Sequence, residues 1–378
     1  MNPPSDKPAP IKGRGSASNQ EGRFESTRTE VFDDGWFREP GEPERPKTEV
    51  RIESARSIIS LKQSPDLPFD LSLNPYRGCE HGCVYCYARP SHGYLNLSAG
   101  LDFETKLFAK TNAAELLRAE LRKPGHKVSA INLGANTDPY QPIEREHRIT
   151  RQVLEVLLEY KHPLTIITKN SLVERDLDLL KPLAEQQLVQ VFLSVTSLDN
   201  RLSAILEPRA TAPHRRIEAI ARLNAAGVPA GVFVAPIIPV ISDQDLEAIL
   251  EAAAGAGAIH ASYTLIRLPH EVKDLFREWL ALHFPDRADH VMHRIQDLRG
   301  GKDYDARFFH RMQGQGVFGE LIRQRFRVAC KKFGWSGANS RSCASICSGC
   351  RLSLVRRVTC SLKGKLPMAA HAARSDSD

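Results

Sequence analysis

The sequence predicts an α/β protein built as a partial or full (β/α) barrel, with a disordered N-terminal arm and a basic C-terminal extension. Between residues 128 and 284, short apolar runs rich in β-branched residues alternate with segments of helical apolar spacing. The runs are apolar on both faces, as in a parallel sheet that helices cover on both sides. The chain of 378 residues, 42% of them hydrophobic, is long enough for one large globular domain or two ordinary ones.

Strands and helices are expected to alternate through this segment. The strands are predicted at residues 128–134, 163–169, 189–195, 229–239 and 259–268. The helices are predicted at residues 150–160, 173–186, 212–227, 242–257 and 269–284. Gly227 is expected at the C-terminal cap of its helix, Ser242 at an N-terminal cap, and Pro269 at a first helical position.

Two further strands are expected earlier in the chain, one before Cys79 and one near Leu101–Phe108. They bring the total to about six or seven βα units, which suits an incomplete or complete barrel. In such barrels the chemistry lies on the loops that follow the carboxyl ends of the strands. A doubly wound open sheet is the alternative, because hydrophobic periodicity alone does not separate the two folds.

The ends of the chain differ in composition from this core. Residues 1–50 are rich in Pro, Gly, Ser and charged residues, so we expect a disordered N-terminal arm. The barrel core is assigned to residues 51–300, and a helical extension to residues 301–340. Residues 341–378 are expected to form a basic tail that contains cysteines and can be disordered.

The net charge of +7 is concentrated near the C-terminus. Residues 320–365 contain eleven Lys or Arg and one acidic residue. Basic patches of this kind often contact phosphate groups, so segment 323–365 is a candidate contact for nucleic acid. A solvated helix face followed by a loose tail is the alternative interpretation.

No run of 18 apolar residues is present, and the N-terminus has no apolar signal region. The sequence therefore predicts no membrane span and a cytoplasmic, reducing location. Disulfides rarely persist in such a compartment. The eight cysteines are accordingly expected to be metal ligands, core residues or reactive thiols.

Three of these cysteines are crowded into the stretch NPYRGCEHGCVYCYARP, residues 74–90. Cys79, Cys83 and Cys86 have the spacing C-x3-C-x2-C in a loop after the first predicted strand. A structural zinc site needs a fourth ligand, which His81 or His92 could supply. A disulfide would leave one thiol over. A [4Fe–4S] cluster held by three thiolates would keep one iron open for a substrate or cofactor.

The pattern C-x3-C-x-aromatic-C, with Tyr85 as the aromatic residue, resembles the signature of the radical S-adenosylmethionine (SAM) superfamily. Several segments are similar to those of the spore photoproduct lyase-like, or DNA repair photolyase-like, group. They are GANTDPYQP (134–142), TIITKN (165–170), VFLSVT (191–196), EPRATAPHRRIEAI (207–220) and GVPAGVFVAPIIP (227–239). The N-terminal KGRG and residues 74–110 resemble an uncharacterised bacterial subgroup of it.

The resemblance implies a barrel of the radical SAM type and an enzyme with an oxygen-sensitive [4Fe–4S] cluster on Cys79, Cys83 and Cys86. The open iron would chelate SAM. An electron from a reduced flavodoxin or ferredoxin-type donor would cleave SAM to methionine and a 5′-deoxyadenosyl radical. That radical would abstract hydrogen from an unknown substrate, either nucleic acid or a peptide or small molecule.

The resemblance also implies SAM contacts at strand ends. Thr137 and Asp138 are expected to reach the polar groups of SAM, and Lys169 its carboxylate. A hydroxyl of Ser194 or Thr196 is expected at the ribose. Each has an alternative structural use, such as a helix cap for Lys169, a turn for Asp138 or a satisfied loop hydroxyl.

Aromatic and backbone contacts complete the implied site. Tyr85 is expected beside the adenine, and the Ala235 backbone amide is expected to meet the same ring. Tyr87 is the candidate catalytic residue, by analogy with tyrosines that support radical relay in the lyases, with core packing as the alternative. Glu207 and Arg209 are expected to form an ion pair that shapes their loop.

At one position the sequence differs from the lyase pattern, and this difference limits which lyase properties can be expected of this chain. Ala135 stands where spore photoproduct lyase has the cysteine that returns hydrogen to the product radical. No cysteine lies between Cys86 and Cys330. The lyase reaction itself is therefore doubtful. The alternative function is a nucleic-acid-binding protein with a structural metal–cysteine site and no SAM turnover.

A second cysteine group lies near the C-terminus. Cys343, Cys347 and Cys350 repeat the x3 and x2 spacings. A second cluster, with Cys330 or Cys360 as fourth ligand, a zinc site and no metal at all are the three alternatives. Cys330 lies in a helical segment and is expected to be a buried core thiol.

Overall fold

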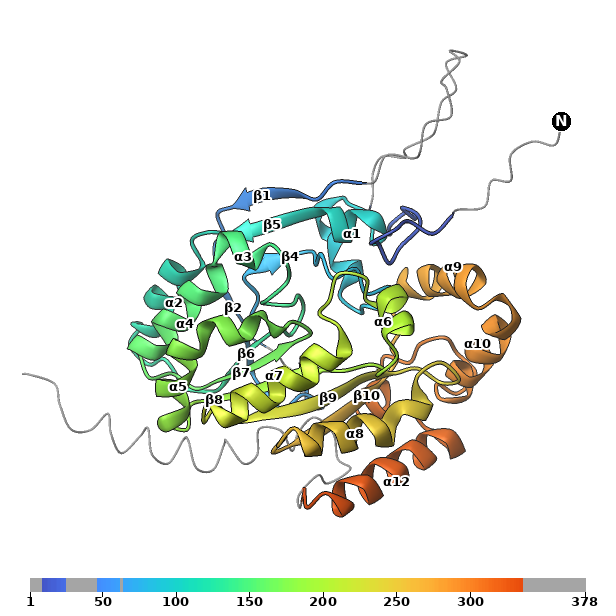
Figure 1. The fold of residues 1–378 in the computed structure, drawn as a ribbon. Coiled ribbons are helices and arrows are strands. Elements are labelled where there is room, and N and C mark those ends of the chain that lie inside the picture. The colour runs from blue at the N-terminus through green and yellow to red at the C-terminus, as the bar shows by residue number, and fades with distance from the viewer. Residues whose placement is uncertain (1–8, 25–45, 62–63, 336–378) are drawn as a thin grey trace, which may run out of the picture.

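The computed structural model describes residues 9–24, 46–61 and 64–335 (Figure 1). Its largest element is a sheet of seven strands in the order β10-β9-β8-β7-β6-β3-β2. The strands are β2 (Ile59–Leu61), β3 (Leu71–Leu73), β6 (Ile131–Leu133), β7 (Leu164–Thr168), β8 (Val189–Ser194), β9 (Ala230–Ile237) and β10 (Ala261–Leu265).

The topology of this sheet is that of a partial barrel. From β3 to β10 every neighbouring pair is parallel, and the strands follow one another in chain order. A doubly wound sheet reverses its strand order at a switch point, and no reversal occurs among the described strands. Within the described residues β2 and β10 each have one neighbour, so the barrel is open.

A smaller sheet flanks the barrel. It has the order β1-β5-β4 and contains β1 (Glu49–Glu53), β4 (Tyr76–Arg77) and β5 (Lys106–Lys110). The prediction of a barrel strand near Leu101–Phe108 is wrong, because helix α1 (Leu101–Thr105) leads directly into β5. The acidic side chains of α1 face inward, where Glu104 meets the buried Arg89. This tertiary contact overrides the local apolar pattern.

Helices cover the outer face of the main sheet (Figure 1). The α-helices are α2 (Ala113–Leu121), α3 (Glu144–His147), α4 (Ile149–Glu159), α5 (Leu177–Glu185), α6 (Asn200–Leu206), α7 (Pro213–Ala225), α8 (Leu246–Gly255), α9 (Val272–His283), α10 (Ala288–Asp297), α11 (His310–Gln313) and α12 (Gly316–Lys332). Short 3-10 helices are η1 (Arg89–Leu95), η2 (Ser171–Asp176), η3 (Asp243–Asp245) and η4 (Pro285–Arg287). None of the described helices is long and apolar enough to span a membrane.

The three predicted helix caps have different outcomes. Gly227 follows α7 with φ of 80°, as expected of a residue after a helix. Ser242 is the N-cap residue of η3, which leads into α8, but its Oγ accepts a hydrogen bond from Ile238 N at 3.0 Å and none from the helix. Pro269 lies ahead of α9, whose N-terminal cap is Glu271.

The apolar interior forms two main groups. One lies between the main sheet and its covering helices, from Leu73 on β3 to Tyr263 on β10. The buried thiol of Cys330 on α12 belongs to this group, as predicted. The other lies under α9 and α10 and includes Trp279 and the side chain of Cys83. The cysteine loop is therefore built onto a core of its own.

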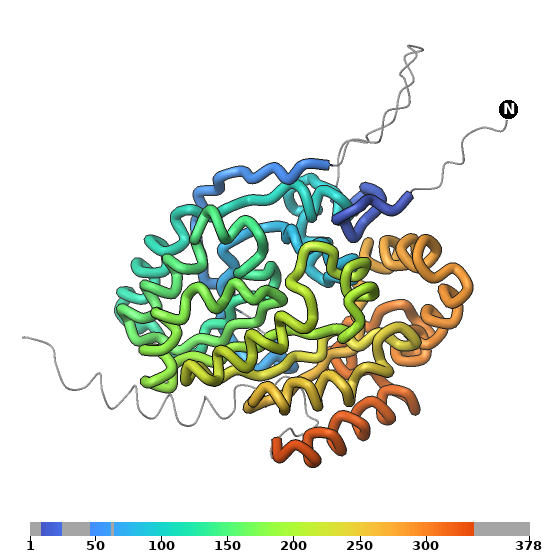
Figure 2. Tube along the Cα trace, viewed as in Figure 1, coloured from blue at the N-terminus to red at the C-terminus, as the bar shows by residue number. Residues whose placement is uncertain are grey.

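The prediction of a disordered arm over residues 1–50 is wrong for the N-terminal strap, residues 9–24. This segment lies against α1 and α9 (Figure 2). Ser18 Oγ donates to Glu278 at 2.7 Å. The strap contributes little apolar surface; it is held by buried polar groups of distant segments, which composition does not reveal. The predicted basic tail, residues 341–378, lies outside the described residues.

Candidate active site

The cysteine loop, residues 79–86, follows β4 and faces the carboxyl ends of the barrel strands. Cys79 N donates to Phe103 O at 2.9 Å, which fixes the start of the loop. Gly82 has φ of 68°, a left-handed conformation that glycine adopts without strain. A Cβ at Gly82 would lie 2.8 Å from the Glu104 carboxylate. The loop thus needs glycine here for both reasons.

Arg89 anchors the loop from beneath. Its fully buried guanidinium donates to Cys83 O at 2.9 Å, to Gly82 O at 3.3 Å and to Gly100 O at 2.9 Å. The same guanidinium forms a buried ion pair with Glu104. One charged side chain therefore satisfies the carbonyls of the loop while its own charge is compensated, as a buried charge requires.

The N-terminal strap contacts the cysteine loop on the side away from Arg89. Gly15 N and Ser16 N donate to the two carboxylate oxygens of Glu104 at 3.0 and 2.9 Å. A Cβ at Gly15 would lie 1.7 Å from the carbonyl oxygen of Gly82. The backbones of the strap and the cysteine loop are thus in direct contact, and only glycine fits between them.

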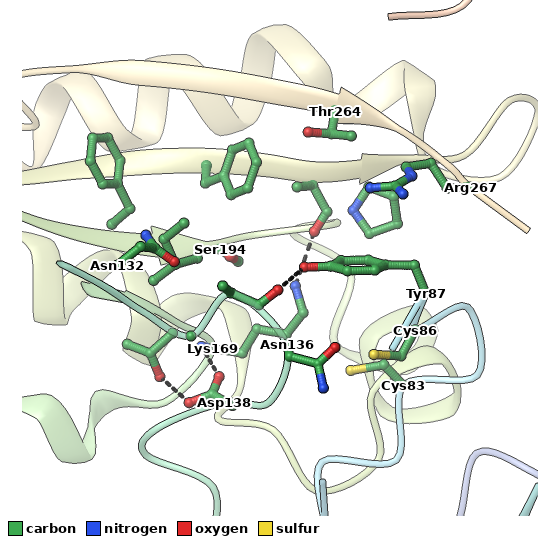
Figure 3. A pocket seen from close by; sticks show the side chains of 18 of the residues that line it. Cys83, Cys86, Tyr87, Asn132, Asn136, Asp138, Lys169, Ser194, Thr264 and Arg267 are labelled. Atoms are coloured by element: carbon green, nitrogen blue, oxygen red, sulfur yellow. Dashed lines mark hydrogen bonds between the residues drawn. The ribbon is translucent and has the colours of Figure 1, made fainter. Parts of the chain in front are cut away.

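The three thiols lie at one pocket. Cys79, Cys83 and Cys86 are free, and all three line it. Figure 3 shows the Cys83 and Cys86 sulfur atoms side by side and facing the same space. Burial raises the pKa of each of the three thiols, so a bound metal would have to draw off their protons.

The two histidines considered as a fourth zinc ligand have other partners. His81 contacts Asp138 at 3.4 Å, and His92 Nε2 lies 2.9 Å from Lys106 O. The three free thiols that line one pocket are the donor set that a [4Fe–4S] cluster uses, in which each thiolate binds a different iron.

The pocket has a volume of about 210 Å³ and lies between the cysteine loop and the strand ends. Its walls are mainly apolar. Polar and charged side chains enter it from the loop and from β6 to β10: Cys79, His81, Cys83, Tyr85, Cys86, Tyr87, Asn132, Asn136, Asp138, Thr165, Thr168, Lys169, Ser194, Thr264 and Arg267. Predicted site residues from distant segments thus meet at one pocket.

Asp138 and Thr137 differ in whether their side chains reach the pocket. Asp138 lines the pocket and accepts hydrogen bonds from Thr168 Oγ1 and Lys169 N, both at 2.7 Å. Burial alone would raise the pKa of Asp138, but its His81 contact and these bonds lower it. Thr137 is not among the lining residues, and its hydroxyl donates to Tyr76 O at 3.0 Å. Its side chain is therefore already engaged away from the pocket.

Lys169 lines the pocket and is held on two sides. Its Nζ donates to Ala235 O at 3.0 Å and lies 3.4 Å from the Glu207 carboxylate. Glu207 also contacts Arg216 at 2.5 Å, in a fully buried ion pair. Burial opposes ionisation of Glu207, but the charges of Arg216 and Lys169 lower its pKa to about 2. Glu207 is therefore a buried, ionised carboxylate.

Tyr85 and Thr196 complete this buried network. The Tyr85 hydroxyl donates to Glu207, and Thr196 Oγ1 lies 2.5 Å from the same carboxylate and 3.0 Å from Ala235 O. The Tyr85 ring lines the pocket with Lys169 Nζ 5.9 Å from its centre, whereas Thr196 is not among the lining residues. Both hydroxyls are thus used within the protein.

The predicted ion pair between Glu207 and Arg209 is wrong. Glu207 turns inward to Arg216, while Arg209 pairs with Glu80 of the cysteine loop at 2.8 Å. Two residues that are neighbours in sequence thus serve different partners, because the chain turns between α6 and α7.

Tyr87 lies beside the residue that replaces the lyase cysteine. Its hydroxyl donates to the Ala135 carbonyl, and both residues line the pocket. The guanidinium of Arg267 lies over the Tyr87 ring, 4.7 Å from its centre. Ser194 also lines the pocket, from the end of β8. No thiol stands at position 135, although the backbone there reaches the site.

Sequence reasoning missed several pocket residues. Arg267 follows β10, Asn132 lies on β6 and Thr264 on β10, and Met312 comes from α11. Arg267 had a usable signal, because it is a charged residue at the carboxyl end of a predicted strand, 259–268. Met312 had none, since its helix is distant in sequence from every strand end.

Comparisons with known proteins identify the family. Residues 73–253 match the model of the radical SAM superfamily. An uncharacterized protein of Mycobacterium tuberculosis is 38% identical over 240 residues, which are 63% of this chain and 70% of the relative. The chain belongs to the radical SAM superfamily. A second relative of this radical SAM protein, an uncharacterized protein of Methanocaldococcus jannaschii, is 30% identical over 199 residues, 53% of this chain and 71% of that protein.

Solved structures show the same fold for this radical SAM protein. Spore photoproduct lyase complexed with dinucleoside spore photoproduct has a TM-score of 0.55 and 14% identity, covering 79% of this chain and 85% of that one. A mutant of that lyase with bound AdoMet and the same dinucleoside has a TM-score of 0.51 and 16% identity over the same shares. At this identity the likeness concerns the fold.

Proposed function

We propose that this radical SAM protein is an enzyme in which Cys79, Cys83 and Cys86 hold a [4Fe–4S] cluster and the adjoining pocket binds SAM. One observation carries the proposal: three free, largely buried thiols with the spacing C-x3-C-x2-C line the same pocket as the polar strand ends. When bound, cluster and SAM would supply a 5′-deoxyadenosyl radical that abstracts hydrogen from the substrate.

The residues of the chain have supporting tasks in this proposal. Arg89 and the N-terminal strap hold the cysteine loop in place. Lys169 offers a cation, and Ser194 a hydroxyl, at the strand ends that face the loop. Asp138 orders the backbone there through Lys169 N. Apolar walls exclude water, which protects a reactive radical from side reactions.

The substrate is proposed to differ from that of the lyase in how its radical is quenched. Ala135 offers no hydrogen atom of the thiol kind, whereas the Tyr87 hydroxyl reaches the same position. Tyr87 is therefore our candidate for the residue that relays the radical. A reduced flavodoxin or ferredoxin-type protein is the proposed electron donor, and a cytoplasmic setting would keep the cluster reduced.

Loss of one thiol tests the proposal. Wild type, reconstituted without oxygen, is expected to bind about four irons and four sulfides per chain and to form 5′-deoxyadenosine with dithionite and SAM. Cys83→Ala should lose both iron and product. Cys330→Ala is the matched control and should keep both, because this buried thiol lies on α12.

A wild-type chain that stays free of iron after reconstitution would contradict the proposal, as would 5′-deoxyadenosine formed by Cys83→Ala. A chain that holds iron but never cleaves SAM would favour the structural metal site instead.

A further inference from the structure

The pocket has a cationic side that the proposed chemistry does not use. Arg267 lines it opposite Asp138, and its guanidinium points inward (Figure 3). Its Nη1 lies 3.6 Å from Met312 Sδ, and its charge lies over the Tyr87 ring. Neither neighbour is negatively charged, so these contacts leave the charge of Arg267 uncompensated.

Nothing else in the described part of the chain neutralises Arg267. It forms no ion pair with any described residue, and its buried Nε has no hydrogen-bond partner there. Asp138 is the one carboxylate among the described lining residues, and it is engaged by Thr168 and Lys169. A buried N–H without an acceptor is unfavourable, so a ligand that accepts from Arg267 would be stabilised.

A second guanidinium reinforces this charge from behind. Arg299 is 2% exposed and donates only to carbonyls among the described residues, at 2.7 Å to His310 O and 2.6 Å to Ile266 O. Burial, and then the charge of Arg267, lower the pKa of Arg299 to about 10. Neither cation forms an ion pair with a described carboxylate. The nearby Asp305 acts on Arg299 but pairs with Arg307, so it offsets the charge only in part, and this side of the pocket attracts an anion.

The rest of the pocket suits an apolar body. Phe192, Phe233 and Leu265 line the same pocket with apolar side chains. A ligand that fits both features has a flat or apolar part and an oxyanion at one end. The guanidinium presents N–H groups in a fork that matches the paired oxygens of a phosphate or carboxylate.

We propose that Arg267 binds an oxyanion of the substrate, a phosphate ester or a carboxylate, while the apolar part of the substrate lies against Phe192, Phe233 and Leu265. This inference deepens the proposed function and rests on it, because it assigns the space beside the SAM site to the substrate. Arg267 then determines specificity for anionic substrates.

Small probes test the subsite without knowledge of the substrate. Phenyl phosphate and benzoate carry the two oxyanions on one aromatic ring, and benzyl alcohol is the neutral analogue. Their affinities are measured by ligand-observed NMR titration of the full-length chain, reconstituted and saturated with SAM, and of the same chain without iron. Arg267→Gln, Arg267→Lys and the control Arg277→Gln are compared; Arg277 pairs with Asp303 outside the pocket.

Arg267→Gln is expected to weaken the tighter oxyanion at least about tenfold and to leave benzyl alcohol unchanged. Arg267→Lys should keep part of the affinity, since it retains the charge but loses the fork. Arg277→Gln should match wild type. The tighter of the two oxyanions identifies the substrate class. If Arg267→Gln does not fold, an Arg267→Lys variant that binds the tighter oxyanion more weakly than wild type, with benzyl alcohol unchanged, supports the subsite, and wild-type oxyanion affinity in that variant overturns it.

Three results overturn the inference: unchanged oxyanion affinity in Arg267→Gln, an equal loss for benzyl alcohol, or a loss of SAM affinity alone, which would assign Arg267 to SAM. Failure of the proposed function would be recognised separately, as a wild-type chain that binds no iron or does not cleave SAM. Oxyanion binding by that chain can still be measured in the iron-free titration.

Discussion

At the scale of single residues, Glu207 joins the protein interior to the pocket. Its buried carboxylate meets Arg216 at 2.5 Å and Lys169 at 3.4 Å, and accepts the Tyr85 hydroxyl. A buried charge is tolerated only when its partners compensate for lost hydration. Glu207 therefore helps to orient Lys169, which also donates to Ala235 O, and Tyr85, and both residues line the pocket.

Glu207→Gln should destabilise the fold, and the effect should depend on pH. The pKa of Glu207 is lowered to about 2 from an ordinary 4.5, so its ionised form stabilises the folded chain by on the order of 3 kcal/mol. Because a lowered pKa stabilises above the unfolded value, this contribution is present at pH 7 and is lost as pH falls from about 5 towards 2. Urea unfolding of the iron-free chain at pH 7, 5 and 3 measures it.

Glu247→Gln is the control, because its pair with Arg325 is partly exposed and is worth about 1 kcal/mol or less. A deficit of Glu207→Gln that is as large at pH 3 as at pH 7 would show that the charge of Glu207 is not what stabilises the fold.

At the scale of elements, the cysteine loop is held between two segments. Arg89 binds its carbonyls from one side, and the N-terminal strap covers Gly82 from the other. Glu104 of α1 joins both, since it pairs with Arg89 and accepts from Gly15 N. The strap thus stabilises the loop that presents the thiols.

Gly15→Ala should loosen the cysteine loop, because the new Cβ would lie 1.7 Å from Gly82 O and force the strap away. Iodoacetamide should then alkylate Cys79, Cys83 and Cys86 of the iron-free chain several-fold faster, as followed by peptide mass spectrometry. Cys330, on α12, is an internal reference whose rate should not change.

Gly255→Ala is the matched control, since a Cβ there meets nothing within 4 Å. Equal alkylation rates in Gly15→Ala and wild type would exclude a role of the strap in holding the loop.

At the scale of the whole molecule, only some of the basic residues near the C-terminus form ion pairs with acidic residues. On α12, Arg325 pairs with Glu247 and Lys332 with Glu251, both on α8. Part of the basic face of the predicted segment 323–365 is thus neutralised inside the fold. The remaining candidate charges for nucleic acid are Arg327 and Lys331 on α12, which form no ion pair with a described carboxylate, and six Lys or Arg between residues 341 and 365, which lie outside the described residues.

A chain that ends at Trp335 is expected to keep its fold but to lose affinity for single-stranded DNA. Each phosphate contact contributes about −0.7 to the slope of log affinity against log salt for single strands. The six basic residues of the tail should therefore make the slope of the full-length protein steeper by about 4 than that of the shortened chain, which keeps Arg327 and Lys331. Fluorescence anisotropy at several salt concentrations measures both slopes. Equal slopes would exclude the tail as a nucleic-acid contact.

The main features of fold and site could be predicted because they are local in the sequence. The alternation of apolar runs located β7 and β8 within one or two residues. The cysteine spacing pointed to one loop, and polar residues such as Lys169 followed strands that meet at one edge. The structure of the segment near Leu101–Phe108 was not predicted correctly, because contacts with residues far along the chain determine its conformation.

Local patterns of polarity and spacing therefore specify a parallel barrel with three thiols at its carboxyl end. They do so because strand and helix periods, and the reach of neighbouring ligands, extend over a few residues. The contact of Gly15 with Gly82, the inward turn of Glu207 and the uncompensated charge of Arg267 depend on long-range packing. The partner of a buried charge is whichever group the folded chain brings near it, and no pattern within a single segment encodes that choice.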